Sequence, residues 1–256
     1  MSGFQLLMEP KDIVYRYDGS LAGFYSCVYD CVYGRDLPLD IQAEKEAQVS
    51  LFAPRRIDTD FSRATRVRNA ISQKISPRAL ELCEYVFLSC LPQKEMAMLR
   101  FIVLGFQTGS AIVNHMSEPV VDTMLKAEKH LRSEAHLLSG FIRFADYDGR
   151  LISTISPKNF VLPLLAPHFA DRFSLERFLI YDQTHNVALV YENGRADLTE
   201  LEGEWPDISE TERFYQELWT QFYHTIGIEA RTNPRCRMTH MPKRYWENMV
   251  EMKPQL

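Results

Sequence analysis

The stretch from Arg231 to Met249, RTNPRCRMTHMPKRYWENM, combines positive charge with aromatic rings. Its five basic residues all precede its first acidic residue, Glu247. Basic side chains neutralise phosphates and tyrosine or tryptophan rings stack on nucleobases, so this composition favours binding of nucleic acid or another phosphate. The candidate binding residues are Arg231, Asn233, Arg235, Arg237, Lys243, Arg244, Tyr245 and Trp246.

A second interpretation of these charges needs no ligand. The segment could be a solvated basic tail that pairs with the acidic run between Glu192 and Glu217. Under both interpretations, Pro234 and Pro242 keep much of the segment out of regular helix. We therefore predict a shaped loop that leads into a short final helix.

A second group of positive charges, the N-terminal basic stretch, begins at Arg55 and reads RRIDTDFSRATRVRNAISQKISPR. Its only acids are Asp58 and Asp60. Arg63 and Arg66 share one face of a predicted helix by their spacing, away from its apolar stripe. Such a stretch is usually a polar helix face. We hypothesise that this stretch and the C-terminal segment would form one positively charged groove if folding brought them side by side.

Groups suited to acid–base chemistry occur in SPKNFVLPLLAPHFADRF. His168 and Asp171 are three residues apart, so in a helical turn the carboxylate could orient the imidazole for general acid–base catalysis. Arg172 and Lys158 could hold a phosphate beside them. Two alternatives stay open: contact with a ligand without catalysis, or a structural role in which the histidine and aspartate cap a proline-rich turn.

No metal or cofactor site is predicted. His130, Glu134 and His136 cannot converge as the ligands of an HExxH site do, because His136 is displaced around the helix. The five cysteines, predicted to be reduced buried thiols, include no CxxC pair. Gly34 stands where a CxxxCxxC iron–sulfur motif needs its third thiolate. His136 lies just before a predicted strand and could orient a substrate or a partner. Arg143, on that strand, is a further candidate for binding phosphate.

The composition restricts the classes of function. The 256 residues carry a formal net charge of -5 with a pI of about 5.8, so a polyanion would have to be bound by a local patch. The sequence contains no GxGxxG, P-loop, GxSxG elbow or zinc-deaminase pattern, which leaves open whether the chain is an enzyme. No signal peptide is recognisable and no apolar window is long enough to cross a bilayer, so we expect a soluble, cytoplasmic protein.

Periodicity indicates the elements that position these groups. Helical spacing recurs from Asp18 to Gly140, and two hairpin regions follow, with turns that include Asp148–Gly149 and Asn193–Gly194. A short, proline-interrupted helix is predicted between the hairpins, and a last helix begins at Ser209 with a capping box. The predicted fold class is α+β, with a helical layer packed on an antiparallel β-sheet.

Four stretches together resemble the bacterial probable DNA metabolism proteins that contain the domain of unknown function DUF4130. They are YDGSLAGFYSCVYD, EAHLLSGFIRF, VLPLLAPHFADRF and ERFYQELWTQFYHTIGIEARTNPRCRMTHMPKRYWENM. The resemblance covers nearly the whole chain. We accordingly expect one DUF4130-like domain over residues 1–256, with a mostly helical part at 1–139 and a β-rich part with C-terminal helices at 140–256.

The resemblance also implies a partner. Proteins of this family are typically encoded beside a radical SAM protein presumed to act in DNA modification or repair, and in similar proteins the domain is joined to a uracil-DNA glycosylase-like domain. The iron–sulfur chemistry would then lie in the partner. No established activity comes with the resemblance, so it assigns no role to a catalytic residue.

Three functions are consistent with these observations. The first is an accessory factor in DNA repair or modification that acts with a radical SAM partner and contacts DNA or a nucleotide through the C-terminal segment. The second is a metal-independent enzyme that acts on a nucleobase or nucleotide through His168 and Asp171. The third is a protein-docking scaffold without DNA affinity. Tyrosine and tryptophan residues near the termini also leave a homodimer open.

Overall fold

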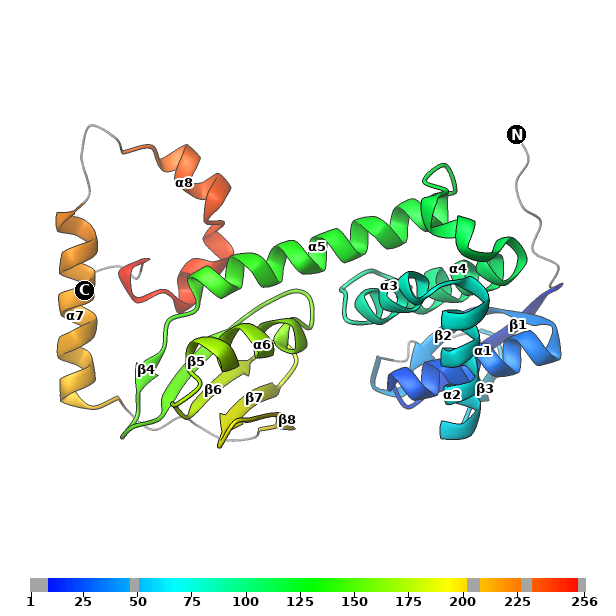
Figure 1. Cartoon of the computed structure of the whole chain (residues 1–256), viewed down its shortest axis with the longest axis horizontal. Coiled ribbons are helices and arrows are strands. Elements are labelled where there is room, and N and C mark those ends of the chain that lie inside the picture. Colours follow the sequence, from blue (N-terminus) through cyan, green and yellow to red (C-terminus); the bar gives the residue numbers. More distant parts are fainter. Residues whose placement is uncertain (1–8, 47–50, 202–207, 227–231, 253–256) are drawn as a thin grey trace. The chain divides into compact units, whose positions relative to one another are not determined.

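The computed structural model describes residues 9–46, 51–201, 208–226 and 232–252 (Figure 1). The chain divides into two compact units, Met1–Leu131 (unit 1) and Arg132–Leu256 (unit 2). Helices and strands occur in both units, so the expected mixture of helix and strand is confirmed. One domain over the whole chain stays a prediction.

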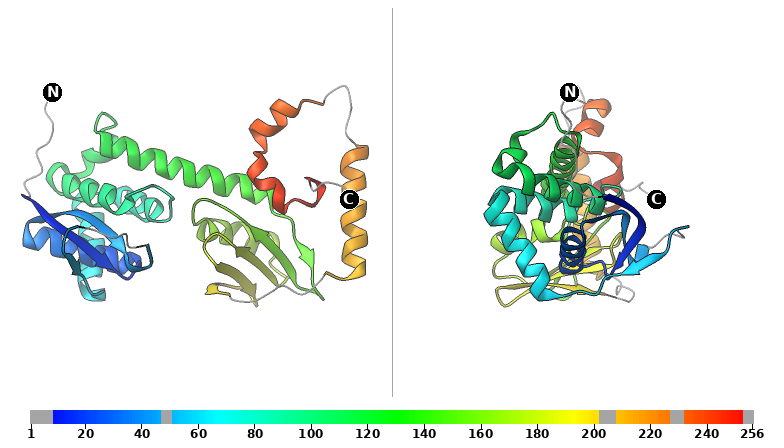
Figure 2. Two further views of the ribbon diagram at one scale, coloured as in Figure 1. Left: turned by 180° about the vertical axis from the view of Figure 1, so that it is seen from behind. Right: turned by 90° about the vertical axis from the view of Figure 1, so that its right-hand side faces the viewer.

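Unit 1 contains a sheet of three strands, β1 (Glu9–Tyr17), β2 (Asp36–Ala43) and β3 (Pro54–Arg56), in the order β2-β1-β3. Both strand pairs are parallel, so the prediction of an antiparallel sheet is wrong here. Parallel neighbours need a crossover, which helix α1 (Leu21–Gly34) provides between β1 and β2. Figure 2 shows this sheet and its crossover helix from two further directions.

Local sequence explains where α1 begins and ends. The side chain of Ser20 caps the helix by accepting a hydrogen bond of 2.9 Å from the amide of Gly23. Arg35 follows the helix with a φ of 55°, in the left-handed region where helices commonly end. The inward face of α1 includes Phe24, Cys27 and Cys31, all fully buried.

The helical core of unit 1 consists of α2 (Phe61–Ala70), a π-helical turn (Ile71–Ile75), α3 (Pro77–Phe87), α4 (Lys94–Thr108) and the first part of α5 (Pro119–Phe141). Gly105 of α4 permits a close approach, because an added Cβ would lie 2.5 Å from Cδ1 of Ile75. Gly109 at the end of the same helix has open space around it and a φ of 67°, so its role is conformational.

One run among the described residues, Lys94–Asn114, is long and apolar enough to cross a membrane by length and composition alone. The sequence had suggested that no window was long enough. Phe101 and Ile102 of this run are fully buried in the core of unit 1. Because the core helix of a globular protein meets the same criterion, the run is weak evidence for a membrane span.

Unit 2 contains a five-stranded sheet in the order β4-β5-β6-β7-β8. The strands are β4 (Ala145–Asp146), β5 (Leu151–Ile155), β6 (Phe178–Asp182), β7 (Val187–Glu192) and β8 (Arg195–Glu200). The predicted turns at Asp148–Gly149 and Asn193–Gly194 are present, each with positive φ at both residues. However, β5 and β6 are parallel, because α6 (Leu162–Arg172) connects them, and the sheet is therefore mixed.

Helix α6 packs on one face of this sheet through aromatic rings (Figure 1). Phe169 is buried, and its ring contacts those of Phe144, Phe173 and Phe178. The predicted proline-interrupted helix is thus confirmed, with Pro167 inside it. Such a cluster buries a large apolar area and holds the helix against the strands.

The C-terminal part of unit 2 is helical. It comprises α7 (Glu210–Thr225), α8 (Pro234–His240) and two 3-10 turns, Lys243–Asn248 and Val250–Met252. Ser209 caps α7 as predicted. The predicted shaped loop is partly wrong, because Pro234 occupies the first turn of α8, where a proline is tolerated.

Three of the five cysteines, Cys27, Cys31 and Cys83, are buried in unit 1 and form no disulfide, and Cys90 and Cys236 are exposed. Burial raises the pKa of the Cys31 thiol to about 12 and also raises the pKa values of Cys27 and Cys83. The prediction of buried thiols therefore holds for the first three and is wrong for Cys90 and Cys236.

Candidate functional site

The described part of the predicted binding stretch, called here the C-terminal basic segment, comprises residues 232–249. Its helix α8 is capped by Asn233, whose side-chain oxygen accepts a hydrogen bond of 2.9 Å from the amide of Cys236. Asn233 therefore has a structural task in addition to its predicted role. Arg231 lies outside the described residues.

Three cations of this segment carry uncompensated charge. Arg235, Arg237 and Lys243 are exposed, and none of them forms an ion pair with another residue in the described ranges. The guanidinium carbon of Arg237 lies 5.1 Å, and Nζ of Lys243 5.8 Å, from the centroid of the Trp246 ring. A ring positions these two cations without neutralising them.

Trp246 is itself held in place. Its Nε1 donates a hydrogen bond of 3.0 Å to the carbonyl of Met241, and its side chain is only partly buried. The indole thus has a fixed orientation and a partly open surface beside two cations. This arrangement of a ring and neighbouring positive charges suits a nucleotide, with its base and its phosphate.

Arg244 and Tyr245 contact the body of unit 2 instead, although 35% of the Arg244 side chain stays exposed. Nη2 of Arg244 lies 3.2 Å from Oε1 of Glu134, and the Tyr245 hydroxyl donates to the same oxygen at 3.3 Å. Tyr245 is only 4% exposed, and burial raises its pKa. In this structure neither ring face of Tyr245 is open to a base, so its predicted role as a stacking residue stays a prediction.

Glu134 of α5 is the centre of a buried network. Its Oε2 accepts hydrogen bonds from the backbone amide of Asn159 at 2.8 Å and from the side-chain amide of Asn159 at 2.6 Å. The amide of Lys158 donates to Oε1 at 3.2 Å. We call Glu134, Lys158, Asn159, Arg244 and Tyr245 the anchoring centre, because together they join three separate parts of unit 2.

Arg143 is also engaged within unit 2. Its Nε and Nη2 contact Oε1 of Glu251 at 3.0 and 2.7 Å, and Nη1 donates to the carbonyl of Gly140 at 3.0 Å. The guanidinium lies over the ring of Trp219, 5.8 Å from its centroid. Because its donors are largely occupied, Arg143 supports the fold, and its predicted contact with phosphate stays a prediction.

The predicted catalytic residues lie on the exposed side of α6. Within the described ranges no hydrogen bond joins His168 to Asp171, and both side chains are exposed. Arg172 lies over the ring of Phe173 at 5.7 Å, and only the backbone of Lys158 enters the anchoring centre. The structure therefore places these four residues in unit 2 without building them into one site.

A different histidine pair was missed. Oδ2 of Asp182 lies 2.6 Å from Nδ1 of His185, and its Oδ1 accepts from the amides of Thr184 and His185 at 3.0 and 3.2 Å. Asp182 is fully buried, and the His185 ring packs edge-on against Phe160. The signal in the sequence was a D-x-x-H pattern directly after an apolar strand, in the stretch YDQTH.

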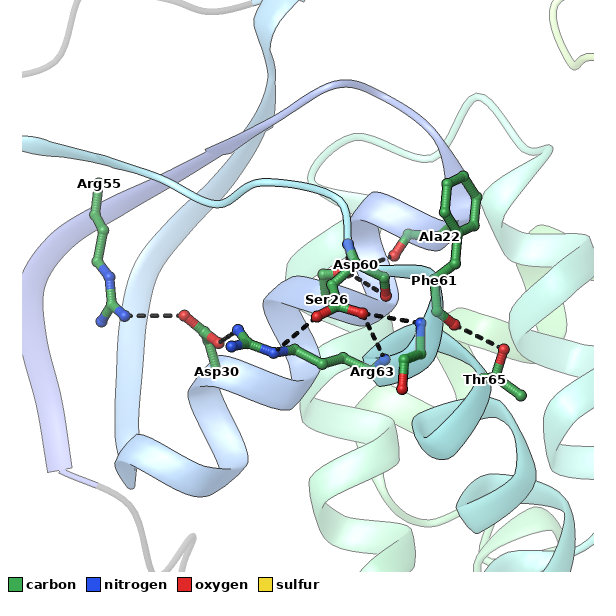
Figure 3. Close-up of polar contacts among 9 residues, drawn as sticks. Ala22, Ser26, Asp30, Arg55, Asp60, Phe61, Arg63 and Thr65 are labelled. Carbon is green, nitrogen blue, oxygen red and sulfur yellow. Dashed lines mark hydrogen bonds and ion pairs between the residues drawn. The ribbon is translucent and has the colours of Figure 1, made fainter.

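The N-terminal basic stretch of unit 1 is largely neutralised. Asp30 of α1 accepts from Arg55 at 2.9 Å and from Arg63 at 3.1 Å (Figure 3). Further pairs are Arg56 with Glu44 and Asp58, Arg68 with Glu84, and Arg78 with Glu81 and Glu128. Arg66 stacks on the rings of two tyrosines, Tyr29 and Tyr33.

A pocket of about 670 Å³ lies beside these pairs. Its lining includes Asp30, Asp58 and Asp60 together with Arg56 and Arg63. Ser26 joins the two helices next to it, because its Oγ donates to the carbonyl of Ala22 and accepts from the amide of Asp60, both at 3.0 Å (Figure 3). Acidic and basic side chains occur in similar number in this lining, so the pocket has no excess of positive charge that would attract a polyanion.

No group of three or more metal-ligating side chains occurs within the described ranges. Glu134, which the sequence placed near two histidines, is committed to the anchoring centre. Nδ1 of His130 lies 3.9 Å from Sγ of Cys90, and His136 is exposed.

Comparison with protein families gives one match. The model of the family described as a domain of unknown function, DUF4130, matches residues 92–251. This range includes the anchoring centre, the Asp182–His185 pair and the C-terminal basic segment, whereas the pocket of unit 1 lies outside it. No curated protein matches the chain.

Proposed function

The chain belongs to the DUF4130 family, and we propose that it is a bacterial, cytoplasmic DNA metabolism protein that contacts DNA or a nucleotide through its C-terminal basic segment. It acts in repair or modification together with a radical SAM partner. The observation that carries the proposal is the group of Arg235, Arg237 and Lys243, exposed and without ion pairs in the described ranges, next to the partly open ring of Trp246.

Each part of the segment has its own task in this function. Arg235, Arg237 and Lys243 neutralise backbone phosphates, and the Trp246 ring stacks on a base. Arg244 and Tyr245 fix the segment to the body of unit 2 through Glu134. The segment is thereby held in one orientation, which lowers the entropy lost when it binds a strand.

The test is fluorescence anisotropy with labelled single-stranded and double-stranded DNA over a salt series. The variant changes Arg235, Arg237 and Lys243 to alanine and leaves Arg244 in place because Arg244 supports the fold. Each lost phosphate contact should lower the slope of log affinity against log salt by about 0.7 to 0.9. The expected result is weaker binding with a shallower slope.

A matched control separates this effect from a general change of charge. Lys74, Arg100 and Lys129 are exposed residues of unit 1 without an ion pair in the described ranges, and their replacement by alanine removes the same three charges elsewhere. This control variant should bind DNA as the wild type does. Wild-type protein that binds no DNA at low salt, or that loses affinity equally in both variants, contradicts the proposal.

The radical SAM partner rests on the family resemblance and needs a separate test. The two proteins should copurify after nuclease treatment if they contact each other directly. Copurification without any DNA affinity would favour the scaffold function over the proposed one.

A second candidate function is metal-independent acid–base chemistry on a nucleobase or nucleotide. The Asp182–His185 pair favours it over His168 and Asp171, because only the former is joined, at 2.6 Å. Asp182 orients Nδ1 and leaves Nε2 of His185 available for proton transfer. Addition of nucleotides to 15N-labelled protein should shift the Nε2 resonance of His185, and unchanged resonances with nucleotides and uracil would contradict this candidate.

A further inference from the structure

The pocket of unit 1 lies just beyond the carboxyl end of strand β3. Its lining runs from Arg56, the last residue of β3, to Arg63 of α2, and includes Asp30 of α1. In the sheet order β2-β1-β3, the chain passes from β1 to β2 on one side and returns to β3 on the other. Open α/β sheets bind their ligands outside the carboxyl ends of the strands, where the strand order changes direction. The pocket therefore lies where a sheet of this kind carries a binding site.

The loop that forms the pocket wall is fixed by hydrogen bonds. The Thr59 hydroxyl donates to Oδ2 of Asp18, directly after β1, at 2.7 Å. The amide of Asp60 donates to Oγ of Ser26 in α1 at 3.0 Å (Figure 3), and Ile57 is buried. Because this wall is already formed, little conformational entropy is lost when a ligand binds to it.

The outer part of the lining presents two opposite charges side by side. Nε of Arg56 lies 3.3 Å from Oδ1 of Asp58, and the two side chains are 72% and 90% exposed. The same Nε lies 3.3 Å from Oε1 of Glu44, which is not part of the lining. Exposed ion pairs of this kind are weak, so a ligand can replace them at little cost. Arg56 and Asp58 are therefore available to a ligand with complementary charges.

Phe61 adds an apolar surface beside these charges. It is the first residue of α2, and its side chain is 75% exposed. Asp30 and Arg63, also in the lining, pair with each other at 3.1 Å (Figure 3). An aromatic ring next to a few charged groups is a common composition for a small-molecule site, and the volume of about 670 Å³ suits a small molecule.

The charges of the lining select the chemistry of the ligand. A phosphate group would meet the carboxylates of Asp30, Asp58 and Asp60. A ligand with only positive charge would meet the guanidinium groups of Arg56 and Arg63. A zwitterion with its two charges close together satisfies both signs at once, as the neighbouring Arg56 and Asp58 require.

We propose that the pocket of unit 1 binds a free α-amino acid with an aromatic or large apolar side chain. Arg56 binds the carboxylate, Asp58 binds the ammonium group, and Phe61 contacts the side chain. A guanidinium group binds a carboxylate well because it can donate two parallel hydrogen bonds. The site lies outside the range that matches the DUF4130 family, goes beyond the proposed function and does not depend on DNA binding.

The test is an NMR titration of the 15N-labelled full chain with L-phenylalanine. The amide resonances of residues 57–63 should shift and reach saturation. The dissociation constant should lie between about 0.1 and 1 mM, because a ligand of this size makes few contacts. Resonances of unit 2 should stay unchanged, since the proposed DNA-binding segment lies in that unit.

Two further ligands test the requirement for both charges. Phenylethylamine lacks the carboxylate of L-phenylalanine, and phenylpropionate lacks its ammonium group. Each should bind at least about tenfold more weakly than L-phenylalanine, because each loses one hydrogen-bonded charge. Deoxyadenosine monophosphate, the nucleotide probe, should cause no shift in residues 57–63.

Two variants assign the charges. Arg56→Gln and Asp58→Asn should each weaken binding of L-phenylalanine by at least about tenfold. Arg56→Gln should leave the affinity for phenylethylamine unchanged, whereas Asp58→Asn should not weaken binding of phenylpropionate. A general loss of structure cannot produce this crossed pattern, and both side chains are largely exposed, so the variants should keep the wild-type spectrum elsewhere.

Glu44→Gln is the matched control, because Glu44 contacts the same Nε of Arg56 from outside the pocket. This variant should bind L-phenylalanine at least as tightly as the wild type does. The absence of saturable shifts in residues 57–63 at about 10 mM L-phenylalanine would overturn the proposal. Equal affinity for the three phenyl ligands, shifts with the nucleotide instead, or a control as weak as Asp58→Asn would also overturn it.

Discussion

The two basic regions of this protein look alike in sequence and differ in structure. In unit 1, Asp30 pairs with both Arg55 and Arg63, Asp60 also pairs with Arg63, and other acids pair with most of the neighbouring arginines. In the C-terminal basic segment, Arg235 and Arg237 have no ion pair within the described ranges. The difference arises because Asp30 lies in α1, 25 residues before Arg55 and 33 residues before Arg63. A count of the charges within the basic stretch therefore does not include it.

The comparison shows that uncompensated charge is the relevant quantity for a nucleic-acid site. An arginine already bound to a carboxylate must give up that contact before it can bind a phosphate. An arginine that lies over a tryptophan ring keeps its full charge. The same distinction divides the C-terminal basic segment itself, because Arg244 is bound to Glu134 while Arg237 is not.

The largest effect on stability is expected at the anchoring centre, where Glu134 pairs with Arg244, the paired cation of the C-terminal basic segment. Glu134→Ala leaves Arg244, Tyr245 and Asn159 without their shared acceptor in a site where Glu134 is 1% exposed. Removing one partner of a buried charged pair costs about 3 to 5 kcal/mol, so the free energy of unfolding in urea should fall by that amount.

Glu84→Ala supplies the control, because its partner Arg68 lies on the surface, with 55% of its side chain exposed. Loss of this exposed pair should change the free energy of unfolding by less than about 1 kcal/mol. Similar losses in both variants would mean that the anchoring centre contributes no more than a surface pair.

The next effect concerns the two aromatic neighbours at the end of the segment. Trp246→Leu should weaken binding of single-stranded DNA by about 1 to 3 kcal/mol, the usual contribution of one stacked base. Tyr245→Phe should leave DNA affinity unchanged, because the ring is buried against Phe141 with centroids 5.6 Å apart. Fluorescence anisotropy measures the DNA affinity of both variants. Because phenylalanine keeps a ring that can stack, a large loss in Tyr245→Phe would mean that the hydroxyl contact with Glu134, and not stacking, sets the affinity.

Parts of this arrangement could be predicted from the sequence. The helices and hairpin turns follow from local patterns: Ser209 before α7, and asparagine or aspartate followed by glycine at the turns, specify their own geometry. The parallel pairs β1–β2 and β5–β6 were missed, because the orientation of a strand depends on which partner it reaches across a connecting helix.

In the candidate site, too, the features that depend on local sequence could be predicted and those that depend on distant residues could not. The cations and rings of the C-terminal basic segment are visible as residue types, so their joint position near Trp246 could be anticipated. That Tyr245 is buried could not, because its partner Glu134 lies 111 residues earlier. The Asp182–His185 pair is local, only three residues apart, and was overlooked because its residues lie within a hairpin turn.

A smaller effect should follow from releasing charge in unit 1. Asp30→Asn removes the carboxylate shared by Arg55 and Arg63. Arg55 thereby loses its ion pair, and Arg63 keeps only its contact with Asp60. If uncompensated charge is what distinguishes the two basic regions, affinity for DNA at low salt should rise by about threefold to tenfold with a steeper salt slope. Unchanged affinity would mean that the two regions differ in more than charge pairing.

The smallest effect is expected when the paired arginines are removed from the wild-type protein. Arg55→Ala combined with Arg63→Ala should change DNA affinity by less than about twofold, because paired arginines contribute little to phosphate binding. The same double change made together with Asp30→Asn should abolish the gain that Asp30→Asn produces alone. A large loss of affinity in the double variant would instead place DNA on unit 1, and the contrast between paired and uncompensated arginines would fail. Anisotropy at one low and one physiological salt concentration distinguishes the two results, since a contribution from phosphate contacts must shrink as salt is raised.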